Sequence, residues 1–306
     1  FLYFGMRPKK KLFRFGIDLG GTKTEAIILD NENKELFRKR IPTKQIEGYE
    51  QIIEDIHGLY LEMVDKIDNE VHTFGIGTPG AVSKKTGFIK NANIACMNER
   101  TFVEDLSNKI GRKIARQNDS NCFAMAEANF GAGKGKKIVF GAILGTGVGG
   151  GLVMDGKLIS GLQSIAGERG HTIINSIGER CEVCGKIGCI ETFLSGRGIE
   201  NKYYQLHGEK IQMKEIDHRY RLGDDACKLI MAEYFSYFGK AFSNLISILD
   251  PDVIVIGGGL SNIEELYVVG VNKIRDYIFN DELRTPIVRN KLGDSAGVLG
   301  AALIGV

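Results

Sequence analysis

Three glycine-rich segments constrain the fold of this chain most, because each directly follows a run of apolar, largely β-branched residues. They are DLGGTKT at 18–24, LGTGVGGG at 144–151 and GGG at 257–259. Glycine has no Cβ, so a turn built from it lets backbone N–H groups approach phosphate oxygens closely. Three such turns at the ends of strands predict an α/β fold with two phosphate-binding loops and a flat surface against which the base of a nucleotide lies.

Length and composition are those of a soluble protein with two domains. The chain of 306 residues is too long for one small core, and 43% hydrophobic with 25% charged residues is an ordinary globular balance. A net charge of +2 argues against nucleic-acid or membrane partners and favours a small-molecule ligand. The sequence shows no membrane-spanning run and no signal peptide, which predicts a cytoplasmic protein. The prefix 1–11 is interpreted as a cloning remnant or a fragment end.

Hydrophobic periodicity predicts strands and helices along the whole chain. Alternating and continuous apolar runs predict strands, and apolar residues at helical spacing predict helices. The first three strands are expected to form a meander on which the first helix packs. The predicted strands are 12–19, 24–29, 34–40, 71–77, 113–116, 138–144, 148–154 and 253–256, and the predicted helices are 49–67, 102–110, one opening near 118–120, 230–246 and 296–304.

Other phosphate-binding fingerprints fit this sequence less well. The segment 18–24 lacks the GxxxxGK[ST] pattern of a Walker A loop, and taken alone it also fits a plain Gly-Gly hairpin turn. The pattern GxGxxG occurs at 145–150 and at 75–80, but a dinucleotide site requires a helix to begin at the third glycine. A strand-like run follows the first match and Pro79 interrupts the second, which argues against a dehydrogenase.

Together with these loops, further motifs resemble those of the ROK family of sugar kinases across residues 12–305. The motifs, in the family's order, are GIDLGGTKT at 16–24, GTPG at 77–80, NDSNC at 118–122, the loop at 144–151, ExGH at 168–171, the cysteines at 181–189, DPD at 250–252, GGG at 257–259 and GDSAG at 293–297. The resemblance implies a two-lobed, actin-like ATPase fold with a cleft between the lobes. The first lobe is expected at 12–118 plus 292–306, and the second at 119–291.

The resemblance also implies roles for individual residues. Asp119 is expected to be the general base, which agrees with a carboxylate at a strand-to-helix corner, although Asn118 and Asp119 alone also fit a helix N-cap. The residues expected to bind the sugar are Gly80, Ala81, Asn91, Asn93, Asn118, Glu168, His171 and Glu191. Those expected to bind ATP and Mg²⁺ are Asp18, Gly20, Gly21, Thr22, Lys23, Gly145, Thr146, Gly147, Gly257, Gly258 and Gly259.

Three cysteines and one histidine predict a zinc clip in the second lobe. In a reducing cytosol the cluster of Cys181, Cys184 and Cys189 favours a metal over a disulfide, and His171 completes a tetrahedral set. The family usually places one residue between the first two cysteines, whereas two residues stand there in this chain. Four protein ligands leave no position for water, so this Zn²⁺ is expected to be structural.

Phosphorylation of the 6-hydroxyl of a hexose by ATP is the activity that the resemblance implies, together with a homodimer. NAN at 91–93, CIETF at 189–193 and DPDVIV at 250–255 are most similar to fructokinases of the family, which favours fructose. LSGRG at 194–198 is similar to N-acetylglucosamine kinases, which leaves that activity and glucokinase as alternatives. The family also contains sugar-responsive repressors, but 15 residues ahead of Gly16 could not form their DNA-binding domain. A non-catalytic sugar sensor stays open.

Overall fold

The computed structural model describes residues 12–83 and 85–305 of the chain. The expected cloning remnant or fragment end at 1–11 lies outside these residues. The chain divides into two compact units, one comprising residues up to Cys122 together with those from Gly297 onward, and the other comprising Phe123–Ala296. Each unit is built on its own five-stranded sheet. The lobe boundaries expected near 118 and 292 lie close to the two division points.

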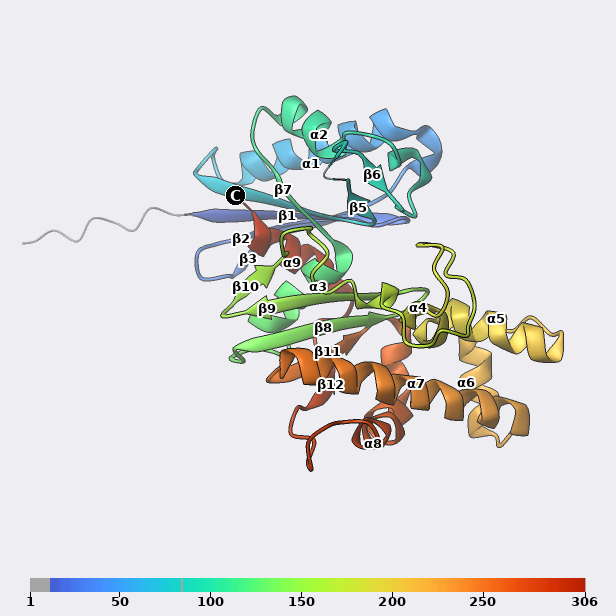
Figure 1. The fold of residues 1–306 in the computed structure, drawn as a ribbon. Coiled ribbons are helices and arrows are strands. Elements are labelled where there is room, and N and C mark those ends of the chain that lie inside the picture. Colours follow the sequence, from blue (N-terminus) through green and yellow to red (C-terminus); the bar gives the residue numbers. More distant parts are fainter. Residues whose placement is uncertain (1–11, 84, 306) are drawn as a thin grey trace, which may run out of the picture. The chain divides into compact units, whose positions relative to one another are not determined.

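The first unit is a mixed sheet with helices on both faces (Figure 1). Its elements are β1 Phe13–Leu19, β2 Lys23–Leu29, β3 Glu35–Pro42, α1 Tyr49–Lys66, β4 His72–Thr78, β5 Ala81–Val82, β6 Ile89–Lys90, α2 Phe102–Ile110, β7 Ala115–Asn118 and α9 Ala296–Ile304. The strand order is β3-β2-β1-β4-β7. The first three strands are antiparallel, which confirms the predicted meander, whereas β4 and β7 are parallel to β1. Helices α1 and α2 cover one face of the sheet and α9 the other.

Two glycines on neighbouring strands let α9 pack directly against the backbone of the first sheet. A Cβ on Gly16 would lie 2.5 Å from the nitrogen of Ala302, and a Cβ on Gly75 would lie 2.0 Å from the carbonyl oxygen of Ala301. A side chain at either position would therefore push the helix off the sheet. This close contact fastens the C-terminal helix to the sheet that begins the chain.

The second unit repeats this plan with a second mixed sheet. Its elements are α3 Asp119–Asn129, β8 Ile138–Leu144, β9 Val148–Met154, β10 Lys157–Ile159, α4 Ile190–Leu194, α5 Gly196–His207, α6 Met213–Arg221, α7 Asp225–Leu249, β11 Val253–Gly257, α8 Val269–Arg275 and β12 Ile287–Arg289. The strand order is β10-β9-β8-β11-β12. As in the first sheet, three antiparallel strands are followed by two parallel ones. The predicted hairpin of β8 and β9 is confirmed.

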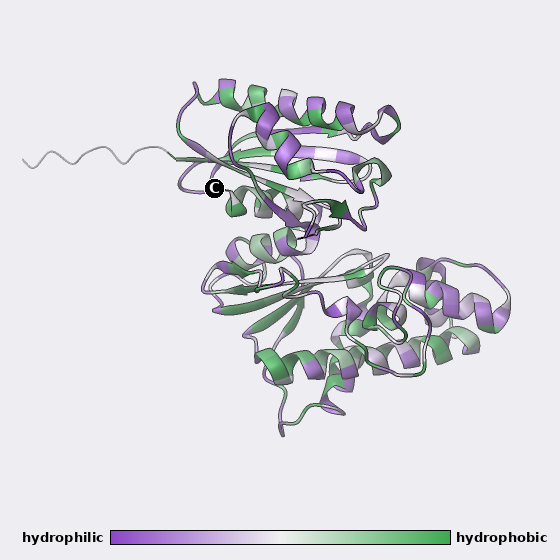
Figure 2. Ribbon diagram, turned by 45° about the horizontal axis from the view of Figure 1, so that its top comes forward, coloured by the Kyte–Doolittle hydropathy of each residue, from purple (hydrophilic) through white to green (hydrophobic). Residues whose placement is uncertain are grey.

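Helix α7 provides the aromatic core of the second unit. Phe235, Phe238 and Phe242 recur at helical spacing, and no more than 1% of each is exposed. Burying one such ring stabilises the fold by about 2–3 kcal/mol. The helix begins at a cap in which the Asp224 carboxylate accepts the Cys227 amide at 2.8 Å. Figure 2 shows the strands of the sheet as largely hydrophobic, while the helices alternate between hydrophobic and hydrophilic residues.

The sheets place the predicted motifs at strand ends. Asp18 at the end of β1 is opposite Gly77 of β4, and Thr78 at the end of β4 is opposite Asn118 of β7. Because the carboxyl ends of parallel strands meet at one edge, these three motifs lie together in the first unit. In the second unit, β8 and β11 are parallel, so the glycine loops that follow them also share an edge. No helix within 12–83 and 85–305 is long and apolar enough to cross a membrane.

Candidate active site

Asp18 ends β1 at a point where its neighbours are small. A Cβ added to Gly297 would lie 2.3 Å from Oδ2 of Asp18, and one added to Gly77 would lie 3.3 Å from Oδ1. Burial, followed by the negative charges of Asp119 and Glu25, raises the pKa of Asp18 to about 7. A carboxylate whose charge is disfavoured in this way is stabilised by a nearby cation. Asp18 therefore fits the predicted approach to Mg²⁺.

The turn after β1 is held from two sides. The Thr43 hydroxyl donates to the Gly20 carbonyl at 2.8 Å, and the side-chain amide of Gln45 donates to the Gly21 carbonyl. The side-chain amide of Asn93 lies 3.9 Å from the position that a Cβ of Gly21 would take. Asn93, which was predicted to bind the sugar, thus lies beside the predicted nucleotide loop. Gln45 also contacts this loop, although no sequence motif had indicated it. The rest of this turn is Thr22, which is exposed, and Lys23, which begins β2.

Asn118 and Asp119 lie at the junction of β7 and α3. The side-chain oxygen of Asn118 accepts the Asn121 amide at 2.8 Å, which is the N-cap geometry that these residues also fitted. Asp119 is exposed to solvent, and its carboxylate accepts the Ser120 amide at 2.8 Å. Although Asp119 keeps solvent-exposed surface, the protein packed around its carboxylate disfavours the charged form and raises its pKa, while the Ser120 amide and the charge of Arg116 act in the opposite direction. An accessible carboxylate with a raised pKa is suited to accept a hydroxyl proton.

Gly80, Ala81 and Asn91 are brought together by the small hairpin of β5 and β6. Ala81 is paired with Lys90 across this hairpin. Gly80 has a left-handed φ of 78°, and a Cβ there would lie 2.6 Å from the Lys90 carbonyl oxygen. Asn91 also has a left-handed φ, 57°, and its side chain is exposed. The structure therefore places these three predicted sugar-binding residues in one loop cluster.

In the second unit, Glu191 contacts the glycine loop between β8 and β9. Its Oε2 atom accepts the Val148 amide at 3.0 Å. A Cβ on Gly147 would lie 2.8 Å from the same oxygen, so only glycine admits the carboxylate at this distance. The Gly145 amide donates to the Gly147 carbonyl at 3.0 Å and closes the turn, at whose tip Thr146 is exposed. A residue predicted for the sugar thus supports a loop predicted for the nucleotide.

The glycines after β11 differ in what they allow. A Cβ on Gly257 would lie 2.5 Å from the Phe123 ring, and one on Gly258 would lie 2.4 Å from the Leu144 carbonyl oxygen. Gly258 also has a left-handed φ of 81°. Packing and turn geometry therefore require glycine at these two positions. Gly259 faces open space, with nothing within 4 Å of an added Cβ, and is exposed.

The four predicted zinc ligands form one cluster. The ligand atoms of His171, Cys181, Cys184 and Cys189 all lie within 4.8 Å of one another. Sγ of Cys184 is 3.3 Å from Sγ of Cys189, and Sγ of Cys181 is 3.7 Å from Nδ1 of His171. Such separations fit a tetrahedron with zinc–sulfur bonds of about 2.3 Å. Since Nδ1 of His171 faces the cluster, Nε2 is the nitrogen left for another partner.

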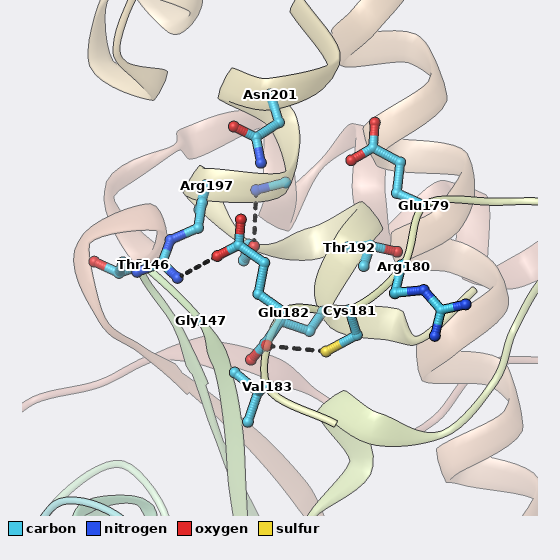
Figure 3. Close-up of a pocket in the computed structure, with 13 residues that line it drawn as sticks. Thr146, Gly147, Glu179, Arg180, Cys181, Glu182, Val183, Thr192, Arg197 and Asn201 are labelled. Atoms are coloured by element: carbon cyan, nitrogen blue, oxygen red, sulfur yellow. Dashed lines mark hydrogen bonds and ion pairs between the residues drawn. The ribbon is translucent and has the colours of Figure 1, made fainter. Parts of the chain in front are cut away.

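A pocket of about 170 Å³ adjoins this cluster (Figure 3). Its walls come from the β8–β9 loop, residues 179–183 and the first turn of α5. Glu191 lines it, and the ion pair of Arg197 with Glu182, 2.9 Å long, lies beside it. The remaining predicted sugar residue, Glu168, precedes a single 3-10 turn and accepts the His171 amide through its carbonyl at 3.4 Å. The pocket is therefore bordered by residues that the sequence assigned to sugar, nucleotide and metal.

Comparison with known sequences covers almost the whole chain. The ROK family model matches residues 14–305. An N-acetyl-D-glucosamine kinase of Pasteurella multocida is 35% identical over 304 residues, which cover 95% of this chain and 98% of the relative. An N-acetyl-D-glucosamine kinase of Vibrio atlanticus is 36% identical over 304 residues, covering 95% of this chain and 99% of the relative.

Solved structures agree with this result. A ROK hexokinase from Thermus thermophilus has a TM-score of 0.88 at 29% identity, covering 96% of this chain and 97% of the other. A ROK family glucokinase from Streptomyces griseus, in complex with glucose and AMPPNP, has a TM-score of 0.73 at 27% identity, covering 96% of this chain and 99% of the other. The expected α/β, actin-like architecture is confirmed by these likenesses. The chain belongs to the ROK family.

Proposed function

We propose that this chain transfers the γ-phosphoryl group of Mg-ATP to the 6-hydroxyl of N-acetyl-D-glucosamine. The observation that carries the proposal is the full-length likeness to N-acetyl-D-glucosamine kinases, at 34–36% identity. The preference for fructose, drawn from three short motifs, finds no support among these relatives, whereas LSGRG at 194–198 agrees with them. That the chain is an ATP-dependent sugar kinase follows from the family, and the choice of the amino sugar is our proposal.

In the proposed reaction the protein mainly positions groups and carries one proton. Asp119 accepts the proton of the attacking hydroxyl, which its exposure and raised pKa favour. Asn118 in the first unit, and Glu168 and His171 in the second, are the side chains proposed to hydrogen-bond sugar hydroxyls. The glycine turns provide amides for the phosphate oxygens. Asp18 would hold Mg²⁺, which would neutralise charge on the transferred group.

The zinc cluster and a homodimer complete the proposal. Zn²⁺ at His171 and the three cysteines would fix the segment that carries Glu168 relative to the helix that carries Glu191, since His171 follows Glu168 closely and Cys189 directly precedes that helix. The homodimer rests on the resemblance alone and stays a prediction.

The test is ADP release from Mg-ATP by the purified protein, with each of six sugars offered separately. They are N-acetylglucosamine, N-acetylmannosamine, glucose, mannose, fructose and N-acetylgalactosamine. We expect the highest kcat/KM for N-acetylglucosamine, and mass spectrometry of the product should show one added phosphate. A higher kcat/KM for glucose or fructose would contradict the proposed substrate but retain the kinase. Absence of turnover with all six sugars, in folded protein that binds ATP, would contradict the kinase itself.

A further inference from the structure

Arg116, which no motif had indicated, binds one loop of the first unit through four polar contacts. Its Nε atom donates to the Thr78 hydroxyl at 2.8 Å. One terminal nitrogen, Nη2, lies 3.2 Å from the carbonyl oxygen of Thr78, 3.1 Å from that of Pro79 and 2.5 Å from that of Gly80. A single side chain on β7 thus holds three consecutive carbonyl groups at the end of β4. This loop is the GTPG motif that precedes the predicted sugar-binding residues.

The loop that Arg116 holds is packed against the next part of the sugar site. A Cβ on Gly80 would lie 2.6 Å from the Lys90 carbonyl oxygen and 2.9 Å from the Ala92 nitrogen, so the two backbones are in direct contact. Ala92 is fixed in turn, because its amide donates to the Asn98 side chain at 2.9 Å and its carbonyl accepts from it at 3.0 Å. Asn91 lies between these two fixed points. Its position therefore depends on where Gly80 is held.

We propose that Arg116 is a positioning residue for sugar binding, which sets Gly80, Ala81 and Asn91 by fixing the 78–80 backbone. The inference rests on the proposed function of these residues as sugar ligands. Arginine suits the task because its planar guanidinium presents five donors in a fixed arrangement. Lysine carries the same charge on a single nitrogen, so it cannot contact the Thr78 hydroxyl and the three carbonyls at the same time. The Arg116→Lys variant therefore removes the donor geometry of the guanidinium while it keeps the positive charge.

The segment between α2 and β7 offers a matched control in Arg112. Its guanidinium donates to the carbonyl oxygen of His72 at 2.6 Å. His72 begins β4, whereas Thr78 ends it, so Arg112 binds the opposite end of the same strand. Arg112→Lys is therefore the same exchange at a residue that contacts β4 but does not contact the 78–80 loop.

The test compares Arg116→Lys with Arg112→Lys in steady-state kinetics with the preferred sugar and Mg-ATP. We expect Arg116→Lys to raise KM for the sugar about tenfold, the effect of losing one or two hydrogen bonds that hold the loop. KM for ATP should stay close to that of the unchanged protein. Arg112→Lys should leave both KM values unchanged. An unchanged sugar KM in Arg116→Lys, or an equal rise in Arg112→Lys, would overturn the proposal.

Hydrogen exchange gives a readout that does not depend on turnover. The backbone amides of 80–82 should exchange faster in Arg116→Lys and at the original rate in Arg112→Lys, because only the first variant frees the loop. Unaltered exchange at 80–82 in Arg116→Lys would overturn the positioning role even if the protein proves not to phosphorylate sugars. Faster exchange together with inactive native protein would instead keep the inference about the loop and remove the proposed function.

Discussion

Sγ of Cys181 lies 3.6 Å from Oε1 of Glu191, while the other oxygen of the same carboxylate accepts the Val148 amide at 3.0 Å. One carboxylate therefore joins the cysteine cluster to the glycine loop between β8 and β9. Cys189 directly precedes α4, the helix on which Glu191 lies. Any movement of the cluster is thus transmitted to a residue proposed to bind sugar and to a loop proposed to bind phosphate.

The first prediction concerns the metal. Replacing Cys181 by Ser would remove one of the four proposed zinc ligands, and we expect the purified variant to contain less zinc than the unchanged protein and to show a raised KM for the sugar. A closed zinc site contributes folding free energy directly, so the Tm should fall as well. Metal content measured by mass spectrometry and Tm measured with and without a chelator check this. Cys96→Ser, outside the cluster, is the control and should retain its metal. Full zinc content in Cys181→Ser would remove Cys181 from the ligand set.

The second prediction concerns proton transfer. Asp119→Asn keeps the size of the side chain but cannot accept the hydroxyl proton, so kcat should fall by about 10²–10⁴. The Kd for the sugar, measured by calorimetry without ATP, should change little. Asp155→Asn is a suitable control because Asp155 lies in the turn between β9 and β10, where its left-handed φ of 50° is tolerated by asparagine. Turnover of Asp119→Asn comparable to that of the control would contradict the general-base role.

The third prediction concerns the pKa of Asp18. Its ordinary value is 3.8, and in the folded protein it is raised to about 7. An acid whose pKa is raised by folding binds its proton more tightly in the native state, so stability falls as pH rises from 3.8 to 7. At pH 8 without Mg²⁺ the Asp18 carboxylate is charged, so the full loss of stability caused by burying this charge is present. Asp18→Asn should then raise the free energy of unfolding by about 1–3 kcal/mol, a value reduced for the partial exposure of the side chain.

Urea denaturation of both proteins at pH 5 and pH 8 measures this effect. The gain from Asp18→Asn should be larger at pH 8 than at pH 5 and should shrink when Mg²⁺ is added to the unchanged protein. An equal gain at both pH values would show that the carboxylate is not the origin of the cost. The same variant should lose kinase activity, because the proposed Mg²⁺ ligand is gone.

Much of the fold could be predicted because its longest elements are strongly periodic. The predicted helices at 102–110 and 296–304 match α2 and α9, and the long helix around 230–246 lies within α7. The strands β5, β6, β10 and β12 and the helices α4, α5, α6 and α8 were missed. In α5 only four residues are buried, two of them glycines, so little of its sequence shows a helical apolar face. The strand predicted at 113–116 is instead β7 at Ala115–Asn118, all of it partly exposed.

The sequence predicted those site residues whose type indicates their chemistry. It did not predict residues whose role depends on contacts with segments far away in the sequence. The four proposed ligands of the cluster followed from cysteine spacing and one histidine, and the structure brings them together. Arg116 and Gln45 act by donating to backbone carbonyls of other segments, and no local pattern reports such partners. Glu191 was predicted as a sugar ligand, yet its contact with the Val148 amide depends on the hairpin that brings β9 near α4.

The last prediction concerns Arg169, the second residue of the ExGH motif, which is 8% exposed. Its guanidinium lies 4.1 Å from the ring centroid of Phe242 and 5.9 Å from that of Phe140. Neither terminal nitrogen has a hydrogen-bond partner among the described residues. Burial lowers the pKa of Arg169 from 12.5 to about 9. Keeping Arg169 charged at neutral pH therefore lowers the free energy of unfolding by about 5 kcal/mol. The contacts with the two aromatic rings offset about 2 kcal/mol of this loss.

Arg169→Met replaces this charge by an apolar side chain of similar length, so the free energy of unfolding at pH 7 should rise by about 1–3 kcal/mol. Because folding depresses the pKa of this base, the cost is fully present at neutral pH and is relieved only as pH rises above about 9. Arg169→Lys, which keeps a charge but stacks less well on the rings, is the control and should be less stable than the unchanged protein. Urea denaturation of the three proteins decides the matter. A methionine variant less stable than the unchanged protein would show that the stacking outweighs the cost of the buried charge.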